Sequence, residues 1–335
     1  MNSNAALVIT TINSPNLALL QAAEGCHQHK IRMIVIGDSK SPANFHIPGV
    51  EYYDLKAQRD SGLAYAKLCP ERHYARKNIG YLLACRGGAE VIIETDDDNL
   101  PTPAFWQTRQ RHQEVESIEE PGWLNVYRYF TDDLIWPRGL PLSKIQRAKS
   151  PVISASVRDC PIQQGLANKN PDVDAIFRLT LPLPFNFSKK ATLALGRSVW
   201  CPFNSQNTTW FRDSFPLLYL PSYCSFRMTD IWRSFVAQRL CWEMDWALLF
   251  HSATVWQDRN DHDLMRDFSE EIPGYLNNEA IGEELEKLTL EKGSSAINDN
   301  LRSCYVKLNQ MGLVSKEELA LVDAWIEDIT MTLKS

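Results

Sequence analysis

Three carboxylates follow one another in the run Thr-Asp-Asp-Asp-Asn at residues 95–99, directly after the apolar segment 91–94. If this run is extended, Asp96 and Asp98 point to one side, where they repel each other unless a cation lies between them, and Asp97 points to the other side. Oxygen ligands suit Mg²⁺ or Mn²⁺, which can also bridge the two phosphates of a nucleotide diphosphate. A solvated acidic turn is the alternative. We therefore predict a metal site at Asp96 and Asp98, with Asp97 left to a hydroxyl or a structural partner.

Two further clusters carry cations. The segment Tyr-Ala-Arg-Lys-Asn opens a predicted helix, in which Arg76, Lys77 and Asn78 could bind a diphosphate or the hydroxyls of a sugar. The same residues would be unremarkable on a solvated helix face. Asp38 and Lys40 could contact a base or a ribose, although Asp-Ser-Lys is also an ordinary turn sequence.

The irregular middle of the chain supplies acidic and neutral candidates. Asp172 and Asp174 alternate ahead of Arg178, and we expect Asp174 and Arg178 to contact a bound sugar, with an exposed strand edge as the alternative. Asn204 and Asn207 carry amides that suit sugar hydroxyls, although asparagine is also common in loops because it favours turns.

A carboxylate and two histidines lie further along the chain. Thr229 or Asp230 is the predicted N-cap of a following helix, and Asp230 could instead act as a general base that deprotonates an attacking hydroxyl. His251, in the last predicted strand, or His262, in the polar loop after it, could complete a metal shell. A single histidine is more often structural or exposed. We take His262 as the candidate third metal ligand.

The first hundred residues are expected to position these groups. Short apolar runs alternate with helical stretches, which predicts a parallel sheet flanked by helices, the Rossmann-like half of an α/β fold. Strands are predicted at residues 6–11, 32–36 and 91–94, and helices at residues 16–27 and 74–85. Ligands of such sheets bind at the carboxyl ends of the strands. These ends carry the acidic run, the turn at Asp38, and a third polar cluster of Thr10, Thr11 and Asn13.

Beyond residue 100 the pattern changes twice. Residues 101–221 are rich in proline and aromatic side chains, as expected of strands and long loops that cover a site. A helix is predicted at residues 228–244 and a last strand at residues 247–256. After Pro273 the composition becomes helical, with predicted helices at residues 279–291, 295–311 and 315–333. We therefore expect a domain at residues 1–272 and a C-terminal helical cap at residues 273–335.

Bulk properties exclude several classes of protein. The formal charge of -6 argues against a nucleic-acid groove, which needs an excess of Lys and Arg. Eight scattered cysteines suggest neither a zinc ribbon nor a disulfide framework. The N-terminus is a poor signal peptide, and no run approaches the roughly 18 apolar residues of a membrane span, so a cytoplasmic protein is expected. No HExxH, Walker A, GxGxxG or GxSxG motif is present.

The motifs taken together resemble a known family. In order along the chain they are Gly-Asp-Ser-Lys-Ser-Pro, Arg-Lys-Asn-Ile-Gly-Tyr, Thr-Asp-Asp-Asp-Asn, Asp-Val-Asp-Ala-Ile-Phe-Arg, Asn-Ser-Gln-Asn-Thr and Ser-Phe-Arg-Met-Thr-Asp-Ile-Trp-Arg. This order resembles the STELLO-type glycosyltransferase-like family and, more distantly, the plant reversibly glycosylated polypeptides, which act as nucleotide-arabinose mutases. The resemblance covers residues 5–275 and leaves the helical tail outside. It implies a GT-A fold, Asp96 and Asp98 as the DxD metal ligands, and the N-terminal clusters around the nucleotide.

The resemblance also implies a reaction. The Phe-Arg-Met-Thr-Asp element is similar to the position where inverting GT-A enzymes keep their catalytic acid, which favours Asp230. We expect a hexosyl- or pentosyltransferase that uses Mn²⁺ or Mg²⁺ and moves a sugar from a nucleoside diphosphate, most simply UDP, to a hydroxyl of a glycan, a lipid-linked glycan or a small molecule. A nucleotide-sugar mutase, and a degenerate scaffold that docks through its helical tail, are the alternatives. A homo-oligomer stays open. Plant STELLO proteins are Golgi membrane proteins, so neither compartment nor acceptor carries over.

Overall fold

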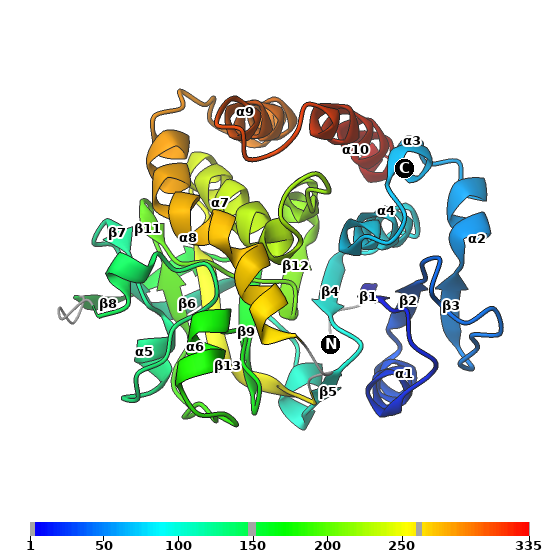
Figure 1. Cartoon of the computed structure of the whole chain (residues 1–335), viewed down its shortest axis with the longest axis horizontal. Coiled ribbons are helices and arrows are strands. Elements are labelled where there is room, and N and C mark those ends of the chain that lie inside the picture. Colours follow the sequence, from blue (N-terminus) through cyan, green and yellow to red (C-terminus); the bar gives the residue numbers. More distant parts are fainter. Residues whose placement is uncertain (1–3, 147–151, 259–262, 335) are drawn as a thin grey trace.

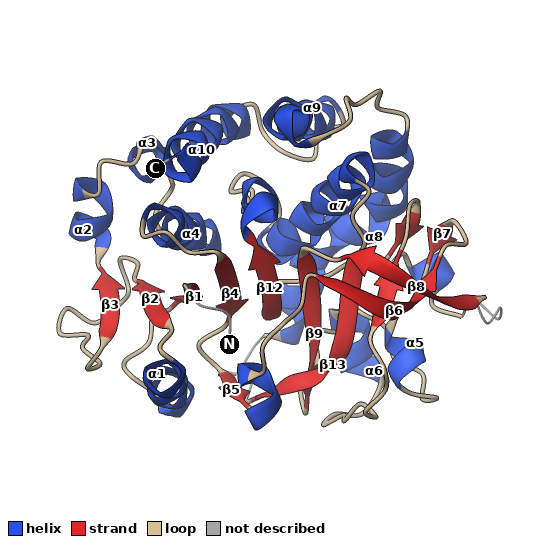
Figure 2. Cartoon of the chain, turned by 180° about the vertical axis from the view of Figure 1, so that it is seen from behind, coloured by secondary structure: helices blue, strands red, loops and turns tan. Residues whose placement is uncertain are grey.

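A computed structural model describes residues 4–146, 152–258 and 263–334, and one large mixed sheet organises them. The strand order is β3-β2-β1-β4-β12-β9-β13-β10-β6-β8, with β5 paired to β13 at the side of this path. Helices cover both faces of the sheet (Figures 1 and 2). The predicted α/β class is confirmed.

The first four strands form a parallel half-sheet. The apolar runs of three of them, at residues 5–10, 32–36 and 91–95, are buried on both faces, as expected of parallel strands covered by helices, while the edge strand is half-buried. The strands are β1 (Ala5–Thr10), β2 (Arg32–Ile36), β3 (Val50–Tyr53) and β4 (Val91–Thr95). Their order 3-2-1-4 is that of a Rossmann half, in which the chain reverses direction across the sheet between β1 and β4. Helices α1 (Leu17–His29) and α4 (Lys77–Arg86) lie on opposite sides of this half (Figure 1).

The second half of the sheet is mixed. Strand β12 (Asn207–Phe211) inserts antiparallel to β4, with Asn207 opposite Thr95, and also antiparallel to β9 (Ile162–Asn168). Strand β13 (Leu248–Gln257) runs parallel to β9. The remaining strands of this sheet are β5 (Asn99–Pro101), β6 (His112–Ile118), β8 (Ile153–Asp159) and β10 (Leu193–Leu195). Strands β7 (Gly122–Trp123) and β11 (Val199–Trp200) pair with each other in a separate two-stranded sheet. Because β12 lies beside β4, the loop that precedes β12 ends next to the acidic run.

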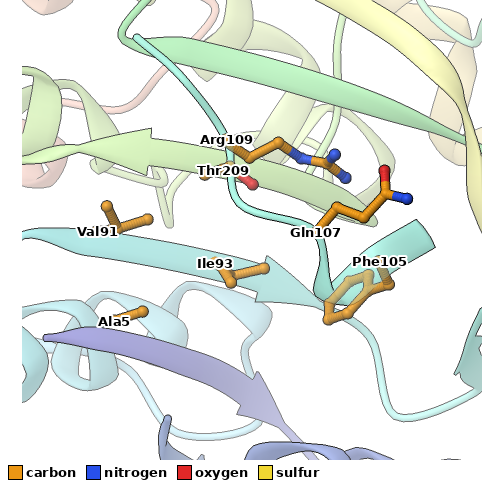
Figure 3. A pocket seen from close by; sticks show the side chains of 7 residues that line it. All are labelled: Ala5, Val91, Ile93, Phe105, Gln107, Arg109 and Thr209. Carbon is orange, nitrogen blue, oxygen red and sulfur yellow. The ribbon is translucent and has the colours of Figure 1, made fainter. Parts of the chain in front are cut away.

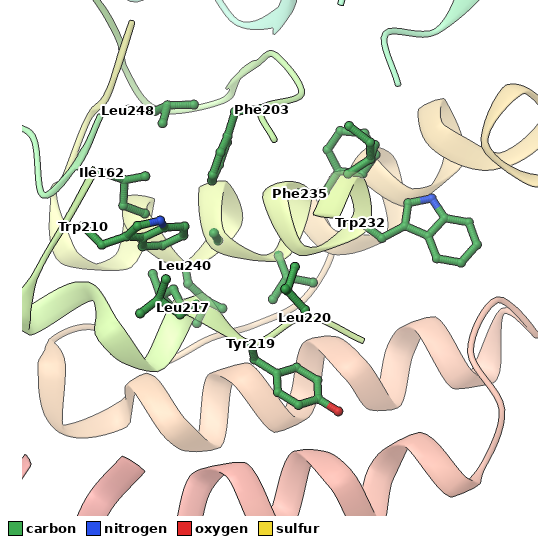
Figure 4. Close-up of a cluster of buried hydrophobic side chains, with 14 of the residues drawn as sticks. Ile162, Phe203, Trp210, Leu217, Tyr219, Leu220, Trp232, Phe235, Leu240 and Leu248 are labelled. Atoms are coloured by element: carbon green, nitrogen blue, oxygen red, sulfur yellow. The ribbon is translucent and has the colours of Figure 1, made fainter. Parts of the chain in front are cut away.

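Helix α7 (Thr229–Cys241) forms the centre of the larger core. All of its residues are buried, since it lies between the sheet and helices α8 (Leu264–Glu286) and α9 (Ile297–Gln310). Figure 4 shows Trp232, Phe235 and Leu240 of α7 in a cluster with Trp210 of β12 and Tyr219. The short α-helices are α2 (Leu55–Asp60), α3 (Ala64–Leu68), α5 (Tyr127–Phe130) and α6 (Ala175–Thr180).

Short 3-10 helices connect several of these elements. They are η1 (Tyr74–Arg76), η2 (Pro103–Trp106), η3 (Leu142–Lys144), η4 (Arg212–Leu218), η5 (Phe226–Met228), η6 (Trp242–Met244) and η7 (Ser294–Ala296). The predicted helix at residues 74–85 therefore begins as η1 and continues as α4.

The C-terminal helices pack directly against helices of the sheet domain. Helix α10 (Glu317–Lys334) packs on α3 and α4, and its Asp328 accepts the backbone N–H groups of Ala64 and Tyr65 at 3.0 and 2.7 Å. Helix α8 begins at Leu264, so the expected start at residue 279 is wrong. The helical composition was expected only after Pro273, yet this proline lies inside α8. The division of the chain at residues 272 and 273 stays a prediction.

Candidate active site

A cleft of about 690 Å³ opens at the carboxyl ends of β1 and β4. This is the place where the strand order reverses, and open α/β sheets bind their ligands there. The volume is in the range of small-molecule sites. Ten sequence-predicted residues line the cleft, namely Thr10, Thr11, Asn13, Asp38, Lys40, Arg76, Asp96, Asp97, Asp98 and Asp230.

The acidic run is a turn and not an extended strand. Strand β4 ends at Thr95, and the backbone N–H of Asn99 donates to the carbonyl of Asp96 at 3.3 Å. The chain must turn here because residues 99–101 pair with β13 instead. The expected alternation, with Asp97 pointing away from the other two carboxylates, is therefore wrong, and Asp97 lines the same cleft as Asp96 and Asp98.

Each carboxylate of the run has its own partners. Asp97 accepts the hydroxyl of Thr11 and, at 3.0 Å, the amide of Asn13, so the polar residues after β1 hold it in place. Asp98 accepts the side-chain amide of Gln257 at 3.0 Å. Burial raises the pKa of Asp97 above its ordinary value, and the hydrogen bonds from Thr11 and Asn13 oppose this rise.

Asp96 faces an internal cation. The ammonium of Lys77 is fully buried and lies 3.3 Å from Oδ1 of Asp96 and 2.7 Å from the carbonyl of Thr95. Burial raises the pKa of Asp96, and Lys77 opposes the rise. Lys77 is not among the residues that line the cleft, and its ammonium lies behind Asp96, which does line it.

The carboxylates fit a cation that the substrate helps to hold. Over the described residues, no group of three or more His, Cys, Asp or Glu side chains is arranged to hold a metal ion by itself. Mg²⁺ is commonly bound by one or two carboxylates, with water and substrate phosphates completing its shell, and the acidic turn can supply these carboxylates. His262 lies outside the described residues. His251 is buried in β13 with Nδ1 at 3.0 Å from the carbonyl of Ser252, and burial lowers its pKa to about 3.

Asp230 enters the cleft from the first turn of α7. The helix begins at Thr229 after Met228, and neither Thr229 nor Asp230 is its N-cap, so the predicted capping role is wrong. The carboxylate is instead held by Nη2 of Arg138, 3.0 Å from each of its oxygens. Burial alone would raise the pKa of Asp230, but Arg138 and Arg233 hold it below its ordinary value.

Arg138 is a cleft residue that the sequence analysis missed. Its guanidinium is almost fully buried and donates to both oxygens of Asp172 at 2.8 Å, besides Asp230 and the carbonyl of Arg227. It stands in a Pro-Arg-Gly segment with no periodic or motif signal, so no pattern in the sequence pointed to it.

The predicted cationic cluster is largely structural. Arg76 lines the cleft, but its guanidinium donates to the side chain of Gln58 and to the carbonyls of Cys69 and Pro70. The amide of Asn78 is buried against Tyr65 and Leu220. Helix α4 lies between the sheet and α10, so its first residues point inward. The structure therefore does not bring Asn78 to the cleft.

Four other candidates do not line the cleft; three of them lie one or two positions from a residue that does, and Arg178 lies further away. Asp174 caps α6 through the N–H of Phe177 at 2.8 Å and accepts Nε1 of Trp136 at 2.6 Å. The polar side chains of the other three candidates contact protein backbone, at Pro171 for Arg178, at Gln206 for Asn204 and at Leu166 for Asn207. Their neighbours Asp172, Ser205 and Gln206 line the cleft in their place. A helix cap at Asp174 and the pairing of β12 with β4 decide which side chains face inward.

Asp38 holds a loop together. Its carboxylate accepts the backbone N–H groups of Ser39, Arg72 and His73 at 2.6, 2.9 and 3.0 Å. It therefore positions the segment that leads into η1, while Lys40 is exposed at the cleft. The missed cleft residues Tyr74 and Ser205 stood inside quoted motifs or beside them, but carried no signal of their own.

A second, small cavity lies beside β4, the strand that leads into the acidic turn. Figure 3 shows Val91, Ile93, Phe105 and Arg109 around it. Its volume of about 10 Å³ has room for a single water molecule. The large cleft is therefore the candidate site.

Of the helices that the structure describes, none combines the length and the apolar character needed to cross a membrane.

Comparisons with known proteins agree on one family. The model of the STELLO glycosyltransferases matches residues 227–334. Two Arabidopsis thaliana proteins are similar over most of the chain. Probable glycosyltransferase STELLO2 is 25% identical over 325 residues, 90% of this chain and 41% of that protein. Probable glycosyltransferase STELLO1 is 26% identical over 322 residues, 89% of this chain and 41% of that protein.

The chain thus spans about two fifths of the length of these relatives. Both comparisons reach into the C-terminal helices, so the expectation that the tail lies outside the resemblance is wrong. Among solved structures, a mycobacterial protein matches with a TM-score of 0.43 at 9% identity, over 82% of this chain and 74% of that one.

Proposed function

We propose, from its similarity to the STELLO glycosyltransferases, that this chain is a GT-A glycosyltransferase, which moves a sugar from a nucleoside diphosphate to a hydroxyl acceptor. One observation carries the proposal. The turn at Asp96, Asp97 and Asp98 presents three carboxylates to a large cleft at the point where the strand order reverses. A nucleotide that enters there meets the carboxyl ends of both β1 and β4.

Asp96 and Asp98 are the residues that would hold Mn²⁺ or Mg²⁺ together with the donor's phosphates. A bound cation would neutralise the charge that develops on the leaving diphosphate. Thr11 and Asn13 keep Asp97 in place beside them, so the turn is pre-formed for the donor. UDP is the donor nucleotide that we propose, on the family resemblance.

Asp230 is the residue proposed to act on the acceptor. Because Arg138 lowers its pKa, its carboxylate is ionised over the whole neutral range and is ready to accept a hydrogen bond from an attacking hydroxyl. A carboxylate with a lowered pKa is a weak base. Proton transfer to Asp230 must therefore accompany the breaking of the donor's glycosidic bond, as in a single inverting displacement.

A binding experiment tests the donor site. The wild type is screened by thermal shift against UDP-glucose, UDP-galactose, UDP-arabinose and GDP-mannose, with and without Mn²⁺, and the best donor is titrated by calorimetry. We expect Mn²⁺-dependent binding that weakens about tenfold or more in Asp98→Asn. Asp60→Asn, on the exposed face of α2, is the matched control.

Two results would count against the proposal. One is that no nucleotide-sugar raises the melting temperature of the wild type in the presence of Mn²⁺. The other is an unchanged donor affinity in Asp98→Asn. An isomerised nucleotide-sugar, formed when the donor is incubated without an acceptor, would identify a mutase instead.

A further inference from the structure

Two hydroxyls join the carboxylates at the two sides of the cleft. The Tyr74 hydroxyl lies 3.0 Å from Oδ1 of Asp96 and 2.5 Å from Oγ of Ser205. The Ser205 hydroxyl lies 3.3 Å from Oδ2 of Asp230, and its backbone N–H lies 3.2 Å from the same oxygen. A continuous series of polar contacts, called the line below, therefore runs from Asp96 through Tyr74 and Ser205 to Asp230.

The sheet topology builds this line. Strand β12 pairs antiparallel with β4 so that Asn207 faces Thr95, which brings Ser205 beside the end of β4. Tyr74 comes from η1, at the N-terminal end of α4, and that end points to the same edge of the sheet (Figure 1). Four separate segments of the chain thus meet at these side chains.

The number of protons limits how the line can be hydrogen-bonded. Lys77 donates to the Tyr74 oxygen at 2.7 Å, so the hydroxyl of Tyr74 has only its own proton to give. Tyr74 and Ser205 together have two hydroxyl protons for three contacts, namely Asp96 to Tyr74, Tyr74 to Ser205, and Ser205 to Asp230. The middle gap of 2.5 Å is the shortest and needs a proton, since two bare oxygens at that distance repel. The Tyr74 and Ser205 hydroxyls therefore both donate in the direction of Asp96 or both donate in the direction of Asp230.

We propose that Tyr74 and Ser205 are positioning residues whose hydroxyls couple the donor side of the cleft to Asp230. This inference rests on the proposed function, which places a cation and a diphosphate at Asp96. Charge that a bound cation withdraws from Asp96 weakens the hydrogen bond from Tyr74, so both hydroxyls turn towards Asp230. Asp230 then receives the hydrogen bond from the Ser205 hydroxyl, in addition to those from Arg138 and the Ser205 backbone, only after the donor has bound.

A cycle of variants measures this coupling. Calorimetry gives the affinity for UDP in the presence of Mn²⁺ for the wild type, Asp230→Asn, Tyr74→Phe and the double variant. With Tyr74 present, Asp230→Asn leaves the hydroxyls pointing towards Asp96, where they compete with the cation, and we expect affinity to fall about three- to tenfold. In the Tyr74→Phe background we expect the fall to be less than about twofold. An equal fall in both backgrounds would mean that only charge through space connects the sites, and would overturn the proposal.

Controls separate coupling from loss of packing. Tyr305→Phe removes another fully buried hydroxyl, which donates to the carbonyl of Tyr219 at 3.2 Å, and should leave the effect of Asp230→Asn intact. Ser205→Ala should abolish the coupling as Tyr74→Phe does, and Ser205→Thr should restore it. Loss of coupling in Tyr305→Phe, or its persistence in Ser205→Ala, would contradict the proposal.

An unliganded measurement keeps this inference distinct from the proposed function. Urea unfolding midpoints are compared for Asp96→Asn, Asp230→Asn and the pair, each with and without Tyr74→Phe. We expect the two midpoint shifts to be non-additive with Tyr74 present and additive without it. If the wild type fails to bind UDP and Mn²⁺, the proposed function fails, and the unfolding cycle alone decides whether the hydroxyls couple the carboxylates. Additive shifts with Tyr74 present would refute the coupling.

Discussion

Arg138 binds Asp230 through one guanidinium nitrogen, which lies 3.0 Å from each carboxylate oxygen, while the same side chain donates twice to Asp172. All three side chains are buried. One cation thus contacts two buried carboxylates at this side of the cleft. Without it, Asp172 and Asp230 would lose the guanidinium that contacts both of them.

Arg138→Met should therefore destabilise the protein strongly. Breaking a buried ion pair by removing one partner typically costs about 3–5 kcal/mol. Urea unfolding at pH 7 measures the change in the free energy of unfolding. Arg302→Met is the control, because the Arg302–Asp323 pair is half exposed and its loss should change stability by less than about 1 kcal/mol. Equal effects of the two variants would show that the buried arrangement at Arg138 contributes nothing special.

The buried cap Asp174 makes stability depend on pH. Burial raises its pKa to about 6, with hydrogen bonds from Phe177 and Trp136 opposing the rise. Because the folded pKa lies above the unfolded value of about 4, the folded state binds more protons between these values, and this group destabilises the fold progressively as the pH rises from about 4 to 6.

Asp174→Asn removes the charge, and its single side-chain oxygen can still accept the N–H of Phe177 but not also Nε1 of Trp136, a loss that costs the same stability at every pH. Relative to the wild type, we expect the stability of the variant to rise by about 2 kcal/mol between pH 4 and pH 7.5. Urea unfolding at a series of pH values measures the difference. A difference that does not change between pH 4 and pH 7.5 would mean that the Asp174 carboxyl is not perturbed by the fold.

Long apolar runs predicted the first half of the fold well. Strand β2 lies at the predicted residues, and β1 and β4 differ from the prediction by one residue at their ends, because a run such as Val-Ile-Ile can be buried only inside a covered sheet. The polar clusters after β1 and β4 met at one cleft for the same topological reason. Local pattern was sufficient for these three strands, whereas β3, the half-buried edge strand Val50–Tyr53, was not predicted.

Positions set by tertiary pairing could not be predicted in this way. Whether Asp172 or Asp174 enters the cleft depends on a helix cap, and whether Ser205 or Asn207 does so depends on the register of β12 against β4. Arg138 approaches from a loop with no periodicity. The sequence expresses none of these relationships locally, so the side of the cleft around Arg138 and Asp230 was the part least accessible to sequence reasoning.

A truncated chain tests the predicted domain boundary. A fragment of residues 1–272 would end inside α8 and would lose Ile281, Leu285 and Trp325, which are all fully buried. Large apolar side chains of this kind contribute about 2–5 kcal/mol each, against a total stability of about 5–15 kcal/mol. We expect the fragment to show no cooperative thermal unfolding by circular dichroism, whereas the full chain does. A cooperative transition in the fragment would support two independent units.

Lys77 supplies the sharpest test of the electrostatics at the acidic turn. Its buried ammonium lies 3.3 Å from Asp96 and repels any second cation bound to the same carboxylate. Lys77→Met keeps the apolar stem and removes the charge, so we expect the affinity for Mn²⁺ alone to rise by about tenfold and the affinity for UDP without metal to fall. Calorimetry measures both, with Lys287→Met on the surface as the control. At Asp96, Lys77 repels a bound cation and attracts the phosphates, so the affinities for Mn²⁺ and for UDP should change in opposite directions. If both rise or both fall, the cation site lies away from Asp96.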